Sequence, residues 1–346
     1  MRTWMRVSVV LCVLLVLLTV PAMAYEVPTD FTDLSLEQAM DEFMQAYGLD
    51  ATNFSVSYHN TGTGERYTFN DKTFMVAGST YKLPLNMYYY ELEHAGTMAP
   101  DVYISRVGAT LDVAHEQSLV YSNNEMSIGM LYNLGEFRSY KELMRKYFTM
   151  PEEEIEPIYY KDNYYCTHMM MDALSYLYEY RADFEEMIGY MKQAQPGEYF
   201  KKYVTEYEVA HKYGWFEGAV NDVGIIYTPQ PFLLAVYSTF VGTAPVEQAA
   251  RLFTNYTLWS APKEVEKPTH LELEVQYVPL PEDAPAEVPA EVPEEVPQED
   301  VQEVFAEEPA EAQSAFEWWM VAVALGVFLL GGGAVLFLLK KSRPKR

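Results

Sequence analysis

The chain has almost no cysteine: of its 346 residues, only Cys12 and Cys166 carry a thiol. Cys12 lies in an N-terminal apolar run that we expect to be removed, so the mature chain can form neither an intrachain disulfide nor a cysteine-based zinc cluster. The six histidines show no metal-binding spacing, so no metal or other cofactor is expected. Cys166 is either a reactive thiol or a small buried hydrophobe, and the usual burial of cysteine favours the second.

Basic residues are also scarce, with 24 Lys and Arg against 50 Asp and Glu and a formal net charge of -26. Phosphate binding needs clustered Lys and Arg, so a nucleic-acid partner is excluded. The acidity is uneven, because no Lys or Arg occurs in 271–339 while Asp and Glu recur through 282–317. The rest of the chain is therefore much closer to neutral, and its charge predicts no acidic binding face.

The N-terminus has the pattern of a secretory signal over residues 1–24. Arg2 and Arg6 precede an apolar run, and Ala22 and Ala24 form a small-x-small cleavage site. An uncleaved membrane anchor is the alternative, but the run is short for a bilayer span. We therefore expect export and removal of this segment.

The C-terminal part predicts a membrane tether. Residues 271–316 are rich in Pro, Glu, Ala and Val and are expected to form an extended acidic spacer. Residues 317–339 contain an uncharged run long enough for a transmembrane helix, and the basic tail 340–346 marks the cytoplasmic side. The body, residues 25–270, is then expected outside the cytoplasm, attached to the cell membrane by a single pass.

The composition of the chain, 49% hydrophobic, is sufficient for a large core in this body. Its periodicity predicts, in chain order, a hairpin, a helical middle part, three strands and a final helix. This order is typical of an α+β fold, in which an antiparallel sheet is flanked by helices and a helical subdomain is present. Residues 101–119 show no clear pattern. The expected strands are 54–60, 66–69, 210–216, 219–227 and 232–240, and the expected helices are 31–47, 79–94, 140–148, 167–181, 183–193 and 245–259.

One stretch combines a nucleophile with a base. Gly78 suits a tight entry turn, Ser79 is a good residue to start a helix, and Lys82 follows three positions later. In a helix these two side chains share a face, so the Lys82 ammonium would stand over the Ser79 hydroxyl, near a helix N-terminus that favours developing negative charge. A surface helix cap is the alternative interpretation. Pro84, in the second turn, predicts a local kink.

Two further motifs favour the chemical interpretation. A Ser-x-Asn sequence at 122–124 lies in a polar turn, and a Lys-Tyr-Gly sequence at 212–214 begins a strand. With the Ser-x-x-Lys sequence at 79–82, they resemble the three-part signature of the serine β-lactamase and penicillin-binding protein superfamily. The likeness to class A β-lactamase-like proteins covers about residues 33–259. It implies a serine β-lactamase-like fold and acyl transfer through a seryl acyl-enzyme.

The resemblance assigns catalytic roles to the first two motifs. Ser79 would be the nucleophile and Lys82 its base or proton relay. Ser122 would pass the proton to the leaving nitrogen, and Asn124 would hold Lys82 and the substrate amide. Acyl transfer needs such an activated hydroxyl and a proton shuttle.

The third motif would contribute binding groups. Lys212 would add positive potential, which keeps Lys82 more readily neutral and attracts a substrate carboxylate. The backbone N–H groups of Ser79 and of Trp215, the residue that follows Gly214, would form the oxyanion hole.

The sequence departs from the family pattern at three positions. Asn123 replaces the Asp of the second motif. Tyr213 replaces the Ser or Thr of the third motif and removes a short hydroxyl that family members use for a substrate carboxylate, which bears against ordinary penicillin recognition. Glu156 is the candidate for activating the deacylating water, although Tyr160 stands where the family has Asn. The alternative is that Glu152–Glu156 is an ordinary solvated charge run.

Three functional hypotheses follow. The favoured one is a membrane-tethered, extracytoplasmic serine acyl-hydrolase that acts on β-lactams or on related amides of the peptidoglycan stem peptide. The second is a penicillin-binding or wall-peptide-sensing module that is acylated but hardly turns over. The third is a non-catalytic surface domain on the same scaffold, for which Ser79→Ala and Lys82→Ala would leave every phenotype unchanged.

Overall fold

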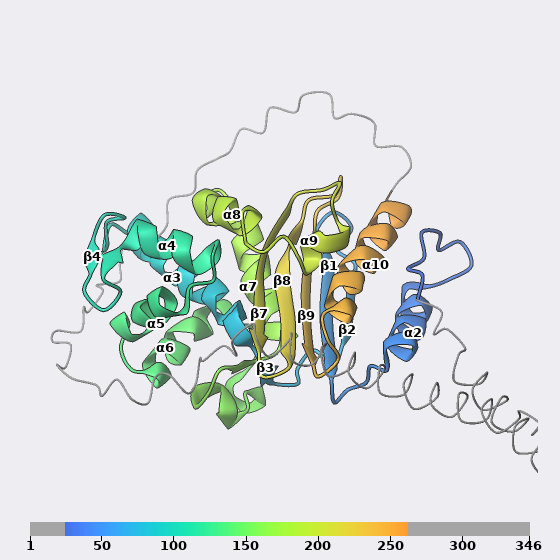
Figure 1. Ribbon diagram of the computed structural model, residues 1–346, viewed down its shortest axis with the longest axis horizontal. Coiled ribbons are helices and arrows are strands. Elements are labelled where there is room, and N and C mark those ends of the chain that lie inside the picture. Colours follow the sequence, from blue (N-terminus) through green and yellow to red (C-terminus); the bar gives the residue numbers. More distant parts are fainter. Residues whose placement is uncertain (1–24, 262–346) are drawn as a thin grey trace, which may run out of the picture.

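The computed structural model describes residues 25–261, and these form a five-stranded sheet between two groups of helices (Figure 1). The strand order is β2-β1-β9-β8-β7, and all neighbours are antiparallel. The α+β fold with an antiparallel sheet is therefore confirmed. The strands are β1 (Phe54–Asn60), β2 (Arg66–Phe69), β7 (Val209–Phe216), β8 (Ala219–Ile226) and β9 (Phe232–Thr239).

The sheet joins the early and late parts of the described chain. β1 pairs with β9 along its whole length, with Phe54 opposite Ser238 and Asn60 opposite Phe232. Every residue of β8 is buried, because helices cover both faces of this central strand. β7 forms one edge of the sheet, and this edge faces the helical region (Figure 1).

Two helices cover one face of the sheet, α2 (Leu36–Tyr47) and α10 (Ala244–Ser260) (Figure 1). α2 begins five residues later than expected from the sequence, because Ser35 and Gln38 form a reciprocal capping box at its start. Aromatic contacts join α10 to the sheet, since the Tyr58 ring stacks on the Phe253 ring with 4.7 Å between centres.

The second group of helices lies on the other face and beside β7 (Figure 1). It consists of α3 (Lys82–His94), α4 (Leu111–Leu119), α5 (Asn124–Asn133), α6 (Phe137–Met144), α7 (Thr167–Glu179) and α8 (Glu185–Lys192). Shorter elements complete the described chain: β3 (Met75–Val76), β4 (Tyr103–Ile104), β5 (Ala109–Thr110), β6 (Tyr164–Tyr165) and α9 (Phe200–Tyr203).

The helix that was expected to begin at Ser79 begins only at Lys82. Gly78–Tyr81 form a 3-10 turn instead, and Gly78 has a φ of +53°, which no α-helical residue adopts. We call Gly78–Tyr81 the Ser79 turn. The chain changes from 3-10 to α geometry at Lys82. The local kink predicted at Pro84 stays a prediction.

Two other segments differ from the prediction. Residues 101–119 form the β4–β5 hairpin and α4, and their strands of two residues are too short for a period to be recognised. The single helix expected over 140–148 is α6, which starts earlier, followed by a separate 3-10 turn at Arg145–Tyr147.

The membrane-related predictions stay predictions. Within residues 25–261, no helix has both the length and the apolar character needed to cross a bilayer. The signal 1–24, the spacer 271–316, the transmembrane helix 317–339 and the tail 340–346 lie outside the described residues.

Cys166 is buried at the start of α7, and burial raises the pKa of its thiol to about 12. At pH 8 only about one thiol in 10⁴ is then ionised, so we expect no reaction with a thiol reagent in the folded protein. Labelling should rise with pH towards 12 and become complete in denaturant. Rapid labelling of the native protein at pH 8, measured by mass spectrometry, would show an exposed reactive thiol instead.

Candidate active site

Two glycines allow the Ser79 turn to lie directly against strand β7. A Cβ atom on Gly78 would come within 2.7 Å of Trp215 N, and one on Gly214 would come within 2.4 Å of Ala77 O and 2.8 Å of Ser79 N. Real side chains do not tolerate such distances, so both positions require glycine. This contact brings the backbone N–H groups of Ser79 and Trp215 next to one another.

Lys82 is fully buried and reaches the second motif. Its Nζ donates to Asn124 Oδ1 at 2.6 Å, to the Ser122 carbonyl at 2.6 Å and to Ser122 Oγ at 3.2 Å. Ser122 has a φ of +55°, a conformation that non-glycine residues rarely adopt. This backbone conformation lets both oxygens of one serine accept from the same amine.

Lys212 approaches the same serine from β7. Its Nζ donates to Ser122 Oγ at 2.9 Å and to the Tyr213 carbonyl at 2.8 Å, and the side chain is fully buried. Two amines from distant parts of the chain thus converge on the Ser122 hydroxyl. A proton on this hydroxyl can be replaced from either amine, so the arrangement is suited to proton transfer.

Two departures from the family signature have a structural explanation. The Asn123 side chain accepts from Met126 N at 3.0 Å and caps α5, a function that Asn and Asp perform equally well. Tyr213 stacks on Tyr199, with 4.7 Å between ring centres, and the Lys212 Nζ lies 4.1 Å from the centre of its ring. An aromatic ring therefore stands beside the third-motif lysine, where the family has a short hydroxyl.

A polar network that the sequence motifs did not indicate binds the backbone of Lys82. Asn86 donates to the Lys82 carbonyl at 2.6 Å and to Ser118 Oγ at 2.9 Å. Its Oδ1 lies 2.7 Å from His115 Nδ1, and His115 Nε2 lies 3.0 Å from Glu93 Oε1. The network fixes the start of α3. The one feature of the sequence that indicates this network is Asn86, a polar residue four positions after Lys82 on the same helix face.

A loop of residues 150–166, here called the tyrosine loop, contacts the Ser79 turn through Asn163. Asn163 Nδ2 donates to the Gly78 carbonyl at 2.8 Å, and the Asn163 carbonyl accepts from Ala77 N at 2.9 Å. Its Oδ1 is buried and has no partner among the described residues. Asn163 was not recognised in the sequence, because the expected position for an asparagine was 160.

Glu156 lies on the same loop, and its side chain is exposed. At position 160, the Tyr160 hydroxyl bonds to Glu152 at 2.9 Å, so it takes no part in holding Glu156. The role of Glu156 in deacylation stays a prediction.

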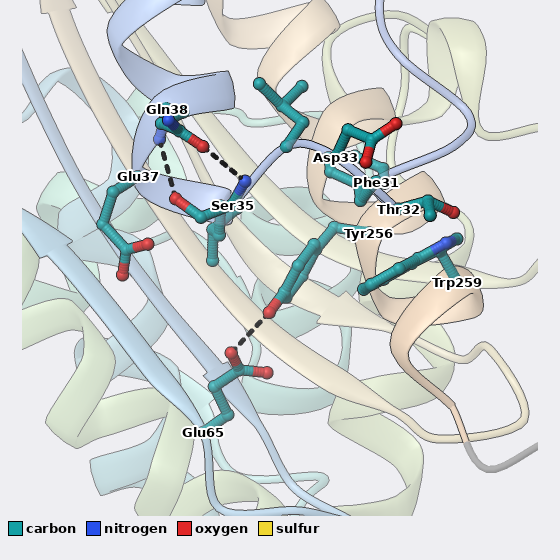
Figure 2. A pocket seen from close by; sticks show the side chains of 11 residues that line it. Phe31, Thr32, Asp33, Ser35, Glu37, Gln38, Glu65, Tyr256 and Trp259 are labelled. Atoms are coloured by element: carbon teal, nitrogen blue, oxygen red, sulfur yellow. Dashed lines mark hydrogen bonds between the residues drawn. The ribbon is translucent and has the colours of Figure 1, made fainter.

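A cavity of about 450 Å³ lies on the far side of the sheet, between the segment before α2, the β1–β2 hairpin and the end of α10 (Figure 2). Tyr256 and Trp259 form one wall, and Tyr256 OH donates to Glu65 at 2.6 Å. None of the motif residues lines this cavity. Residues 25–261 also contain no group of three or more His, Cys, Asp or Glu side chains placed to bind a metal ion.

Comparison with known proteins finds one matching family and several similar solved structures. The family described as "Beta-lactamase enzyme family" matches residues 35–253 of this chain. A solved β-lactamase from Chitinophaga pinensis DSM 2588 is 16% identical with a TM-score of 0.54, and the match covers 64% of this chain and 98% of that one. No curated protein matches the sequence.

Two further solved structures are similar. A β-lactamase from Burkholderia vietnamiensis is 17% identical with a TM-score of 0.54, covering 66% of this chain and 98% of that one. The structure named PBP-A is 14% identical with a TM-score of 0.54, covering 63% of this chain and 95% of that one. At such low identity these structures establish a shared fold and no more.

Proposed function

Because the chain belongs to the β-lactamase enzyme family, we propose that it is a serine acyl-hydrolase acting through a seryl acyl-enzyme on β-lactams or on related amides of the peptidoglycan stem peptide. One observation carries the proposal: two buried amines, Lys82 and Lys212, converge on the Ser122 hydroxyl beside the turn that holds Ser79. Burying two amines is costly, and a shared proton-transfer function accounts for it.

In acylation, the Ser79 hydroxyl attacks the substrate carbonyl, and Lys82 accepts its proton in the neutral form of the amine, in which a lone pair replaces one of the three donated hydrogen bonds. The resulting oxyanion accepts hydrogen bonds from the adjacent N–H groups of Ser79 and Trp215. When the tetrahedral intermediate collapses, the C–N bond breaks and Ser122 gives its proton to the leaving nitrogen. Lys82 then returns a proton to Ser122, which restores the starting hydroxyl.

In deacylation, water attacks the acyl carbonyl and Ser79 leaves as its hydroxyl. The water must give a proton to a base while Ser79 Oγ gains one, and two groups on the tyrosine loop are candidates for assisting it: a carboxylate can take the proton, whereas an amide oxygen can only orient the water. Asn163 Oδ1 is an unpaired buried acceptor next to the Ser79 turn. The Glu156 carboxylate would have to approach from its exposed position. This position, together with the Tyr213 ring, supports the second candidate function, a wall-peptide sensor that is acylated but turns over slowly.

The time course of nitrocefin hydrolysis distinguishes the serine hydrolase from the slowly deacylating sensor. A hydrolase is expected to give steady turnover, because each acyl-enzyme is hydrolysed, with a preceding burst of about one equivalent only where deacylation is slower than acylation. A sensor gives the burst alone, and mass spectrometry then shows the adduct persisting on Ser79. Glu156→Gln should slow only the steady phase if this carboxylate activates the water. Absence of both a burst and steady turnover at high nitrocefin concentration would contradict both functions.

We also propose that the catalytic body is exported and tethered by a single C-terminal span. The support comes from the signal-like pattern of 1–24, the uncharged run in 317–339 and the basic tail that follows it. The test is protease treatment of intact cells, which should remove the body while leaving cytoplasmic proteins whole. A body protected from the protease would contradict the orientation.

A further inference from the structure

Lys141 is a buried amine that the proposed reaction does not use. It lies in α6, its side chain is fully buried, and its Nζ donates to the Tyr164 carbonyl at 3.3 Å. No carboxylate forms an ion pair with it among residues 25–261. Burial lowers the pKa of Lys141 well below its usual value, and the charge of Asp162 opposes this shift. A lysine in this position lowers the stability of the fold, so packing alone does not explain it.

Three rings surround the amine and form an aromatic cage. The Lys141 Nζ lies 3.6 Å from the ring centre of Tyr165, 4.2 Å from that of Tyr159 and 5.4 Å from that of Phe137. Aromatic faces attract an ammonium group and also accept N–H contacts from a neutral amine. The cage therefore gives the amine a defined place without a counter-ion.

The cage connects α6 to both arms of the tyrosine loop. Tyr159 belongs to the 3-10 turn Pro157–Tyr160 in the first arm, and its OH donates to the Lys141 carbonyl at 2.8 Å. Tyr165 belongs to β6 in the second arm, where the Tyr164 carbonyl is also bound. The Lys141 amine thus contacts the first arm through the Tyr159 ring and the second arm through the Tyr165 ring and the Tyr164 carbonyl, in a loop that has little regular structure of its own.

The second arm is the part that contacts the Ser79 turn. Tyr165 pairs with Met75 of β3, which leads directly into that turn. Asn163, two residues before Tyr165, bonds to Ala77 N and to the Gly78 carbonyl. A shift of this arm would therefore move Asn163 relative to the nucleophile, while α3, α5 and β7 would still hold the two motif lysines.

We propose that Lys141 is a positioning residue, whose caged amine holds the second arm of the tyrosine loop against the Ser79 turn. This inference rests on the proposed function for its kinetic consequence: by fixing Asn163, Lys141 governs hydrolysis of the acyl-enzyme rather than its formation.

The test variant is Lys141→Met, which keeps the length of the side chain and removes the amine. We expect a Tm no lower than that of the wild type, because a costly buried amine is replaced by an apolar group. Amide exchange in residues 162–165 should become about tenfold faster, and the penicilloyl adduct should live about tenfold longer. The rate of labelling by a fluorescent penicillin should stay within about threefold.

Lys161→Met is the matched control, because it removes an exposed amine from the same loop. Lys161→Met should leave the Tm, the amide exchange of residues 162–165, the lifetime of the penicilloyl adduct and the labelling rate unchanged. Equal loop exchange and equal adduct lifetime in Lys141→Met and wild type would overturn the inference. So would a lower Tm with faster exchange throughout α3 and the sheet, because this would show a general structural role. If the wild type is not labelled at all, the proposed function fails, and the exchange comparison still decides whether Lys141 holds the loop.

Discussion

Replacing Ser79 by alanine is expected to abolish covalent labelling by a fluorescent penicillin, because it removes the proposed nucleophile from the turn that packs against β7. Loss of a serine nucleophile lowers the reaction rate by about 10⁴-fold or more, which is below detection in a labelling experiment. The fold should be unaffected, since a small hydroxyl is exchanged for hydrogen at a site that is 4% exposed. Gel fluorescence and intact-protein mass spectrometry measure the adduct.

Ser139→Ala is the control for this experiment, because Ser139 lies exposed on α6, away from the motif residues. It should be labelled as fast as the wild type. Labelling of Ser79→Ala at the wild-type rate would remove Ser79 from the mechanism, because the penicillin would then be attached to another residue.

Replacing Gly214 by alanine is expected to lower the acylation rate by about 10²-fold or more, the effect of losing one oxyanion donor. The added methyl group would lie 2.4 Å from Ala77 O and 2.8 Å from Ser79 N, so β7 and the Ser79 turn must separate. The separation pulls the Trp215 N–H away from the Ser79 N–H. The variant should also unfold at a lower temperature, because both contacting groups are backbone and cannot rotate away. Stopped-flow acylation and calorimetry measure the two effects.

Gly189→Ala provides the comparison. Gly189 lies in α8 with no atom within 4 Å of the added Cβ, so the acylation rate should stay the same. The protein should be unchanged or more stable by up to about 1 kcal/mol, because alanine favours a helix. A Gly214→Ala protein with wild-type acylation and Tm would show that β7 and the Ser79 turn are not in close contact.

Much of the fold was predictable from local patterns. Strands β7, β8 and β9 lie within one residue of their expected limits, because each is an apolar run between recognisable turns. The start of α3 was placed wrongly, since Gly78 was read as an entry to a helix, whereas its positive φ serves a 3-10 turn packed on another strand.

The candidate site was predictable only in part. The residues Ser79, Lys82, Ser122 and Lys212 were recognised because the family motifs place them at short, fixed spacings. Asn163 and Asn86 carry no such spacing, and their importance comes from the backbone groups that they reach across the fold. The burial of Lys141 among aromatic rings could not be predicted either, because an exposed and a caged lysine have the same local sequence pattern.

The sequence by itself determined the secondary structure of the sheet, the family and the chemical groups available for acyl transfer. These depend on local periodicity and on motif residues that are close along the chain. Only the tertiary structure decided that two amines meet on one hydroxyl, that two glycines bring two N–H groups together, and that a caged lysine faces the loop. Such contacts join residues tens of positions apart, so their geometry follows from packing of the whole core rather than from any local pattern.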